Sequence, residues 1–293
     1  MLSFKKLSLN DIEAVRPYFH HSLSRACDNT VGGTFMWRDF FETEYCVISD
    51  TLIFKVRHFG GLTAFTLPLG TDVVGSILKI EEYCVNMGIP LVFCAAANED
   101  IAVYEKIFKS IKLEANEDWD DYLYRAEDMI YLAGRKYNGQ RNHINHFMRN
   151  YSNFSFEEIT PENLPEVRDF YLEITSKADK GTKVFREGRE KTIELLDHYE
   201  IYGMTGSLLR VDGAVIGFAV GEMLKDTLFV HVERADPGFR GAYQMLAKLF
   251  PKRFADQGVI YVNREEDDGD PGLRTSKKAF HPIEMIRKYM VTV

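Results

Sequence analysis

A dense run of charged side chains follows the strand predicted at Val259 to Asn263. The run contains Arg264 and then five carboxylates, which are Glu265, Glu266, Asp267, Asp268 and Asp270. Carboxylates this close repel one another, so they must be solvated, paired with cations or bound to a positively charged ligand. The run is therefore either a solvated loop or a site in which Glu265 or Glu266 recognises an amino group.

A second group of candidates lies on the preceding strand, which is predicted at Thr227 to Glu233. Glu233 would point into a cleft where neighbouring strands splay, and there it is a candidate general base. Glu265 is assigned to the catalytic residues as well. The alternative for Glu233 is a structural ion pair with Arg234 or Arg240. Substrate binding is assigned to polar residues of the two strands and the acidic run: His231, Tyr261, Asn263, Glu266 and Asp267.

The residues after this strand have the layout of an anion-binding helix start. The stretch ADPGFRG, from Ala235 to Gly241, leads from the strand through a tight turn and an Arg-Gly step into a predicted helix. The first N–H groups of such a helix and its positive dipole end face an anion. The alternative is an ordinary strand–helix connection. The candidate donor or phosphate contacts here are Arg240, Gly241, Ala242, Tyr243 and Gln244.

Composition limits the classes of protein that fit. The 293 residues are 45% hydrophobic and 27% charged, which is typical of a globular chain with sizeable cores. No stretch approaches the roughly 18 apolar residues that span a bilayer, and we expect a cytoplasmic protein without a membrane span. The four cysteines form no CxxC, so we expect buried reduced thiols and place no metal there.

The net charge of −8 argues against a surface that coats nucleic acid, yet one segment is locally basic. Between Asp128 and Glu157 there is no acidic residue, whereas Arg135, Lys136, Arg141 and Arg149 occur there. On a helix, Arg141 and Arg149 would share a face that contacts the phosphates of a ligand or bridges two domains. His143 and His146 lie in the same segment, but without a carboxylate or thiol partner nearby we place no metal there either.

The order of predicted elements is the same in both parts of the chain, which predicts two domains of one α+β architecture. We place them at 1–130 and 131–293. In the first part we expect strands near 4, 45–48, 52–56, 62–67, 91–97 and 122–124, with helices at 11–19, 71–87 and 100–110. In the second part we expect strands at 154–159, 207–211, 215–224, 227–233 and 259–263, with helices from about 161 and at 186–199, 241–256 and 272–280.

This element order and the junction at Arg240 resemble the GNAT acyltransferase fold. In that family the loop after the fourth strand reads Arg/Gln-x-x-Gly-x-Gly/Ala and binds a pyrophosphate. Arg240 falls on the first position, but Tyr243 and Met245 replace the two small residues. Small residues allow the backbone to approach a pyrophosphate closely, so these departures argue against a conventional coenzyme A site.

Four motifs resemble a more specific family across essentially the whole chain. They are NGQRNHINHF from Asn138, HVERAD from His231, RGAYQ from Arg240 and YVNREEDDGDPGLRTSKKAFHP from Tyr261. Together they resemble proteins grouped with the C-terminal domain of phosphatidylglycerol lysyltransferases. The resemblance implies two tandem GNAT-like domains, an arrangement shared with the Fem aminoacyltransferases, and an aminoacyl-tRNA donor that needs no pyrophosphate site.

The same resemblance gives roles to the last motif. GLRTSKKAF is similar to a Gly-Leu-x-x-Phe-Lys-x-x-Phe stretch of those relatives, and Lys277 falls on the lysine. Lys277 would then be catalytic and would neutralise donor phosphate or a developing oxyanion. Arg274 and Lys278, together with Arg141 of the basic segment, are assigned to donor binding.

The resulting expectation is a transferase that moves an aminoacyl or acyl group to a small-molecule or peptide acceptor in water. Its donor would be aminoacyl-tRNA or acyl-coenzyme A, and no resident cofactor is assigned. Two alternatives stay open: a non-catalytic ligand-binding module on a degenerate GNAT fold, and a coenzyme A-dependent N-acetyltransferase.

Overall fold

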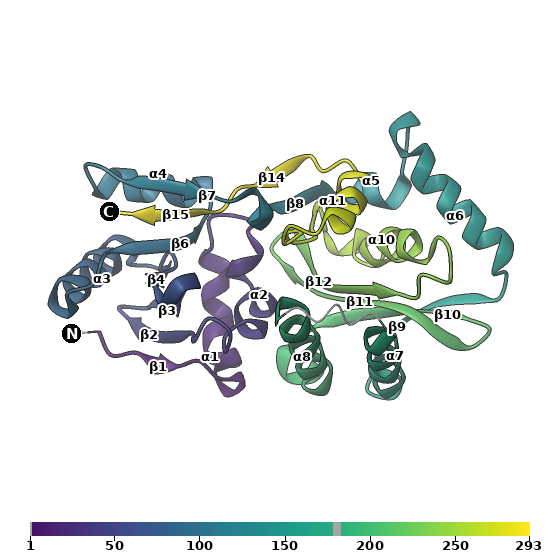
Figure 1. Ribbon diagram of the computed structural model, residues 1–293, viewed down its shortest axis with the longest axis horizontal. Coiled ribbons are helices and arrows are strands. Elements are labelled where there is room, and N and C mark those ends of the chain that lie inside the picture. The colour runs from purple at the N-terminus through teal and green to yellow at the C-terminus, as the bar shows by residue number, and fades with distance from the viewer. Residues whose placement is uncertain (1, 178–182) are drawn as a thin grey trace. The chain divides into compact units, whose positions relative to one another are not determined.

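The computed structural model describes residues 2–177 and 183–293 (Figure 1). The chain divides into two compact units. Unit 1 contains 1–121 and 285–293, and unit 2 contains 122–284. Each unit is built on one sheet with helices packed against it, so the α+β architecture predicted from the sequence is confirmed.

Unit 1 is built on a sheet whose strand order in the described residues is β1-β2-β3-β4-β6-β15-β7, with β5 beside β3. Its strands are β1 (Lys5–Lys6), β2 (Glu44–Ile48), β3 (Thr51–Arg57), β4 (Thr63–Phe65), β5 (Leu69–Gly70), β6 (Val92–Ala96), β7 (Lys112–Ala115) and β15 (Tyr289–Thr292). Its helices are α1 (Ile12–Val15), α2 (Val31–Met36), α3 (Val73–Met87) and α4 (Asn98–Ile107). Asp72 caps the start of α3, and Gly88 ends it at a φ of 64°.

Unit 2 is built on a sheet with the order β14-β8-β13-β12-β11-β10-β9 in the described residues. Its strands are β8 (Asp121–Arg125), β9 (Phe154–Glu158), β10 (Thr205–Val211), β11 (Ala214–Leu224), β12 (Thr227–Ala235), β13 (Tyr261–Asn263) and β14 (Glu284–Ile286). Its helices are α5 (Ala126–Tyr131), α6 (Asn138–Asn150), α7 (Leu164–Lys177), α8 (Lys183–Asp197), α9 (Tyr199–Tyr202), α10 (Ala242–Lys252) and α11 (Pro271–Lys278).

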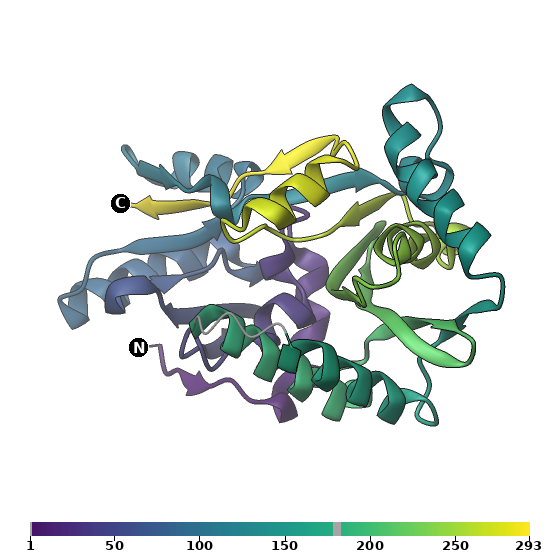
Figure 2. The same ribbon diagram turned by 45° about the vertical axis from the view of Figure 1, so that its right-hand side comes forward.

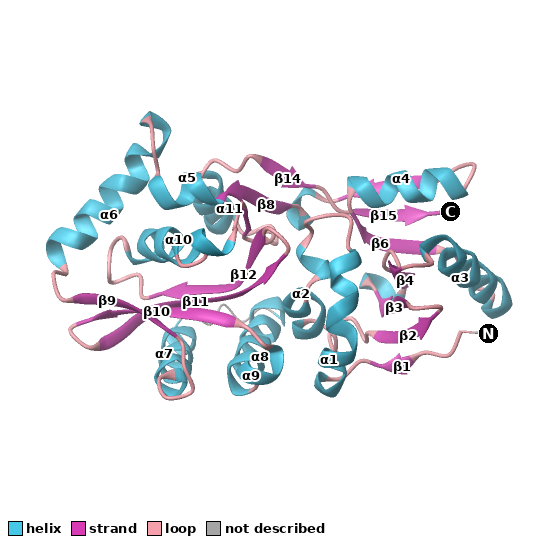
Figure 3. Cartoon of the chain, turned by 180° about the vertical axis from the view of Figure 1, so that it is seen from behind, coloured by secondary structure: helices cyan, strands magenta, loops and turns pink. Residues whose placement is uncertain are grey.

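The helices of unit 2 cover both faces of its sheet. In Figures 1 and 3, α10 lies on one face, and α7 and α8 lie on the other. Helix α10 packs on the sheet because its apolar residues recur at helical spacing, and Met245, Leu246 and Phe250 are buried. Figure 2 shows α6 beside α10, and the two helices are in contact.

Strands β12 and β13 diverge, and this divergence positions the candidate site. They pair in parallel only from Thr227 opposite Tyr261 to Phe229 opposite Asn263. Strand β13 ends there, whereas β12 continues to Ala235 with β11 as its partner. A bulge between β11 and β12 makes His231 an extra residue, because Val220 pairs with Val232 and Gly221 pairs with Val230.

The unit boundaries differ from the predicted ranges 1–130 and 131–293 at both ends. Strand β8 was expected in the first domain, but it pairs with β13, where Tyr124 lies opposite Val262. In exchange, β15 joins the sheet of unit 1, where it pairs with β6 and β7. Such long-range pairing is decided by tertiary packing, which local sequence patterns do not contain.

The helix expected at 11–19 is only partly α-helical. Helix α1 is one turn long, and a 3₁₀ helix continues from Arg16 to His21. Pro17 lies at the start of that 3₁₀ segment and has no N–H to donate to a preceding turn. The strands at Lys112–Ala115, Glu284–Ile286 and Tyr289–Thr292 were not predicted from the sequence.

Candidate functional site

A chain of three ionisable groups crosses the divergence of β12 and β13. His231 lies on β12, and its Nε2 is 2.9 Å from Oε1 of Glu222 on β11. Its Nδ1 is 2.7 Å from Oε1 of Glu265, which follows β13. The imidazole is fully buried, while the Glu265 side chain keeps 23% of its exposure.

Two carboxylates hold the His231 ring in its charged form. Burial by itself lowers the pKa of the imidazole, but hydrogen bonds to Glu222 and Glu265 outweigh burial and raise the pKa to about 10. Both ring nitrogens therefore carry protons at neutral pH, and each donates to a carboxylate. No hydrogen bond joins Oε2 of Glu265 to another of the described residues, and the Glu265 side chain is 23% exposed.

Glu233 and Arg264 form a second connection across the same divergence. Arg264 Nη2 donates to Oε1 of Glu233 over 2.7 Å, and the two side chains are 8% and 11% exposed. The guanidinium lies 5.1 Å from the Phe280 ring centroid and 5.9 Å from that of Tyr124. The alternative considered for Glu233, a structural ion pair, is thus present, but its partner is Arg264 and neither Arg234 nor Arg240.

Lys277 does not have the geometry expected of an oxyanion or phosphate contact. Its buried Nζ donates to the carbonyl oxygens of Arg264 (2.5 Å), Glu265 (3.2 Å) and Glu266. An ammonium has three N–H donors, and three successive carbonyls accept them. Lys277 thus holds the backbone that carries Arg264 and Glu265, and the catalytic role assigned to it from the resemblance stays a prediction.

Asp267 holds the far end of the same loop. Arg274 donates to both of its carboxylate oxygens, at 2.8 and 2.7 Å, and Tyr122 Oη donates over 2.5 Å. Burial alone raises the pKa of the Asp267 carboxyl, but these donors and the N–H of Gly269 lower it to about 2. Asp267 and Arg274 are thus paired with each other, and the substrate and donor contacts assigned to them stay predictions.

Asn263 shapes the start of the loop. Its buried side-chain oxygen accepts the N–H of Glu265 over 2.6 Å, and Glu265 has a φ of 56°, in the left-handed region. A non-glycine residue there carries strain, which proteins retain where the surroundings hold it and a function needs it. Tyr261, Glu266 and Lys278 lie nearby in sequence, and they remain predicted contacts.

The start of α10 is packed against a helix. Gly241 has a φ of 97°, and a Cβ added to it would lie 2.4 Å from the carbonyl oxygen of His143 on α6. Tyr243 points toward solvent with 39% exposure, so it does not fill the site, whereas Met245 is buried. Arg240 is exposed and Ala242 buried, and with Gln244 they remain predicted donor contacts. Glycine here accommodates helix α6, not a pyrophosphate.

Replacing Gly241 by alanine is expected to destabilise the protein by about 2–5 kcal/mol. The left-handed backbone costs roughly 1–2 kcal/mol for a residue with a Cβ, and the collision with α6 adds about 1–3 kcal/mol. Urea denaturation measures the change. Gly139→Ala on α6 is the matched control, because its Cβ would meet nothing within 4 Å, and that variant keeps or gains stability. Equal stability of both variants would show that α6 does not press on this turn.

Arg141 lies on α6, and its guanidinium binds residues close to it in the sequence. Its guanidinium donates to the carbonyl oxygens of Leu132 and Gly134 and to the side chain of Asn138. Leu132 ends α5 with a φ of 51°, so Arg141 satisfies carbonyls that the helix end leaves without donors. This geometry supports a structural role, and the donor contact assigned to Arg141 stays a prediction.

Two residues of the site, Glu222 and Arg264, were not among the predicted site residues. Glu222 lies inside an apolar strand, and a lone carboxylate at a buried strand position could have indicated a buried partner. Arg264 was read as part of the acidic run. Arg264 lies one residue after β13, and its ion pair with Glu233 of β12 could have been predicted only if the divergence of the two strands had been known.

Unit 1 contains two features that stay outside this site. Cys27, Asp28 and Asp121 place potential metal ligands within 4.8 Å of one another. The Nζ of Lys288 lies 2.9 Å from Asp121 and 3.0 Å from Asp28, so an ammonium already neutralises these carboxylates. All four cysteines are buried free thiols.

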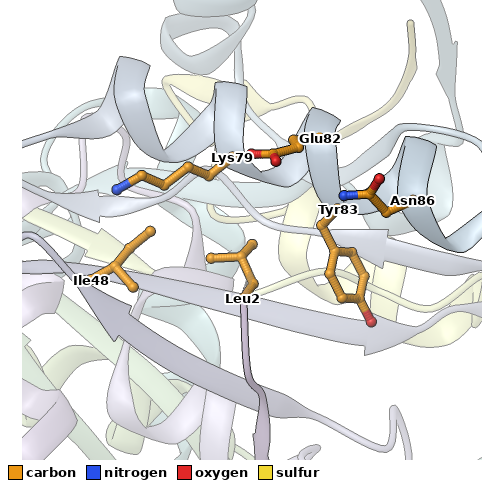
Figure 4. Close-up of a pocket in the computed structure, with 6 residues that line it drawn as sticks. All are labelled: Leu2, Ile48, Lys79, Glu82, Tyr83 and Asn86. Atoms are coloured by element: carbon orange, nitrogen blue, oxygen red, sulfur yellow. The ribbon is translucent and has the colours of Figure 1, made fainter.

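A pocket of unit 1 lies between α3, the residue Leu2 before β1, and Ile48 at the end of β2 (Figure 4). It is lined by Leu2, Ile48, Lys79, Glu82, Tyr83 and Asn86. Lys79 and Glu82 are its charged residues, and both come from the same helix, α3. It contains no group of the chain Glu222–His231–Glu265, and we assign it no chemistry.

Diverging parallel strands followed by a turn and a helix, in each of two units, define a GNAT-like acyltransferase fold. The same architecture is found in FemX, with a TM-score of 0.65 at 8% identity over 99% of this chain and 97% of that one. The chain belongs to the family of phosphatidylglycerol lysyltransferase C-terminal domains, whose sequence profile matches residues 20–292.

Solved structures of similar proteins agree with this placement. A conserved protein of unknown function from Bacteroides thetaiotaomicron is 30% identical over 100% of both chains, with a TM-score of 0.91. The C-terminal domain of a putative lysylphosphatidylglycerol synthetase from Agrobacterium fabrum has a TM-score of 0.67 at 14% identity, over 97% of this chain and 92% of that one. At that identity the likeness shows the fold alone.

A curated relative from Mycoplasmoides gallisepticum, itself described as uncharacterised, is 26% identical over 180 residues. The match covers 61% of this chain and 58% of that protein, so the chain spans little more than half of its relative's length. Within the described residues, no helix is long and apolar enough to cross a membrane.

Proposed function

We propose that this protein transfers an aminoacyl group from an aminoacyl-tRNA to an amine or hydroxyl of a water-soluble acceptor, with Glu265 as general base. The observation that carries this proposal is the chain Glu222–His231–Glu265. His231 binds one oxygen of Glu265 and leaves the other available, in a side chain that is partly exposed. A carboxylate fixed in this way is oriented to accept a proton from an incoming nucleophile.

The supporting framework is rigid on every side. His231 holds the side chain of Glu265, Lys277 holds the carbonyls of residues 264–266, and Arg274 holds Asp267. Catalytic groups must be kept within about half an ångström of productive geometry by such neighbours. Glu265, the residue with positive φ, is held by His231 at its side chain, by Lys277 at its carbonyl and by Asn263 at its N–H, which supports a functional role over a solvated loop.

The start of α10 favours an ester donor over coenzyme A. Gly241 packs against His143 of α6, and Tyr243 and Met245 occupy the positions at which the GNAT loop is small. A pyrophosphate would need close access to that backbone, whereas the ester at the 3′ end of tRNA does not. Arg149 and Arg135 are exposed in the acid-free segment of unit 2, where they are suited to contact phosphates.

The test uses bulk tRNA charged with a mixture of radiolabelled amino acids. The acceptor probe is a pool of glycine, lysine, diglycine and spermidine, and mass spectrometry identifies products. We expect label to move to one of the amines faster than in the enzyme-free reaction. Glu265→Gln should lower that rate about 10²–10⁴-fold, because it removes the base. The exposed Glu200→Gln on α9 is the matched control and should transfer at the wild-type rate.

Two results would replace this proposal with an alternative. Saturable binding of acetyl-coenzyme A, with acetylation of the same amines, would make the protein an N-acetyltransferase. A protein that binds one of the amines but moves no group from either donor would be a binding module.

A further inference from the structure

Arg264 has a buried donor that the protein does not satisfy. Its Nη1 is shielded from solvent and has no hydrogen-bond partner among the described residues. The other terminal nitrogen, Nη2, is bound to Glu233, and the side chain as a whole is 8% exposed. A buried N–H without an acceptor costs about 1–3 kcal/mol, so such a donor calls for an oxygen supplied by water or by a ligand.

The surroundings of Arg264 fix its guanidinium. The ring of Phe280 lies 5.1 Å away and that of Tyr124 lies 5.9 Å away, while Glu233 accepts from Nη2 at 2.7 Å. Lys277 fixes the Arg264 carbonyl at 2.5 Å. The unsatisfied N–H is therefore a preorganised donor, which is the arrangement that stabilises a developing negative charge.

Arg264 and the proposed base are next to each other on one loop. Both reach back to β12, where their partners Glu233 and His231 are two residues apart. Residues with this spacing on a strand lie roughly 6–7 Å apart, so the two connections are neighbours. The proposed base and the unsatisfied donor are therefore adjacent residues of one loop, and each is tied to β12.

We propose that Arg264, and not Lys277, is the catalytic residue that receives the oxyanion of the tetrahedral intermediate; this inference rests on the proposed transfer function. The acceptor nitrogen forms a bond to the ester carbonyl carbon while its proton passes to Glu265. The carbonyl π electrons move to the oxygen, which accepts the Nη1–H of Arg264. When the carbonyl re-forms, the ester C–O bond breaks and the ribose oxygen takes the proton from Glu265.

Tetrahedral and planar donor analogues test this assignment without requiring turnover. The probes are aminoacyl phosphonates of the 3′-terminal adenosine, in glycyl, alanyl and lysyl forms, together with the corresponding planar amides. Calorimetry on wild type should show that one phosphonate binds about 10²–10³-fold more tightly than its amide, which is the usual value of one oxyanion donor. Arg264→Lys, which keeps the charge but loses the fork of donors, should bind both analogues equally.

Two further variants separate chemistry from folding. In Glu233→Gln/Arg264→Gln the pair becomes neutral at similar size, and the phosphonate preference should again vanish while the thermal unfolding midpoint stays near that of wild type. In Lys277→Met the midpoint should fall but the preference should persist in the folded fraction. In transfer assays, Arg264→Lys should lower kcat about 10²–10³-fold with an unchanged KM for charged tRNA.

If both Arg264 variants still bound the phosphonate more tightly than the amide, the assignment would be overturned. The oxyanion would then not depend on Arg264, and the acceptor of the Nη1 N–H would be a bound water. Loss of the preference only in Lys277→Met would return the oxyanion role to that lysine. If the wild-type protein bound neither kind of analogue and also transferred no aminoacyl group, the proposed function itself would fail, and this inference with it.

Discussion

The wild-type protein is expected to lose about 3–5 kcal/mol of stability between pH 6.5 and pH 10 relative to the variant His231→Gln. The pKa of His231 is raised to about 10 in the folded protein, because Glu222 and Glu265 outweigh the effect of burial. In the unfolded chain it is near 6.5, and each pKa unit corresponds to about 1.4 kcal/mol. The folded state therefore binds this proton more tightly than the unfolded state does.

The direction in which stability changes with pH follows from that difference in proton affinity. The stabilising contribution is complete below about pH 6.5, decreases as the pH rises above it, and is lost above about pH 10. Other groups titrate in the same range, so the informative quantity is the difference in unfolding free energy between wild type and variant at each pH. That difference should be largest at the acidic end of the window and shrink toward pH 10.

Urea denaturation at intervals from pH 6 to pH 10 measures the difference. As a check that does not depend on the variant folding, ¹⁵N spectra of the wild-type imidazole at pH 8 should show both ring nitrogens protonated. A neutral ring at pH 8, or a difference that is flat across the window, would mean that the two carboxylates do not hold a charged imidazole.

Replacing Lys288 by methionine is expected to reduce the free energy of unfolding by about 3–5 kcal/mol. The Nζ of Lys288 lies 2.9 Å from Asp121 and 3.0 Å from Asp28, and the lysine and Asp121 side chains are 7% and 0% exposed. Methionine fills a similar volume but leaves the Asp121 charge buried without its cation. An uncompensated buried charge is far more costly than the ion pair is beneficial.

Urea denaturation at pH 7 tests this, and hydrogen exchange of the β15 amides reports the loss within unit 1. Lys112→Met is the matched control, since Lys112 pairs with Glu114 at the surface, where both side chains are largely exposed. Such pairs contribute little, so the control should unfold as wild type does. Equal effects of the two substitutions would show that the buried cluster contributes no more than a surface pair.

Much of the fold could be predicted from local patterns. The hairpin at Asp212-Gly213 joins β10 and β11, because Asp-Gly permits the positive φ values that a tight turn requires. Helix α3 ends at Gly88, as the periodicity and the glycine indicate. What local patterns missed were pairings between distant segments: β8 with β13, and β15 with β6.

In the candidate site, too, single residues could be predicted from the sequence, whereas their partners from distant segments could not. Glu233 was singled out at the end of a strand whose neighbours were expected to splay, Glu265 as part of the acidic run, and His231 as a polar residue of the same strand as Glu233. The structure brings all three to one divergence. Their partners could not be read from spacing. Glu222 comes from the neighbouring strand through a bulged register, and Lys277 was assigned by resemblance, which does not reveal that three carbonyls bind its ammonium.

The exchange of β8 and β15 between the two sheets has a consequence for synthesis on the ribosome. Domains generally fold as they emerge, beginning with the N-terminal one. Strand β15 lies between β6 and β7, yet it is translated after all of unit 2. During synthesis the N-terminal sheet therefore lacks a strand beside β6 until β15 has left the exit tunnel, and during that interval its unpaired strand edges are exposed to chaperones and to aggregation.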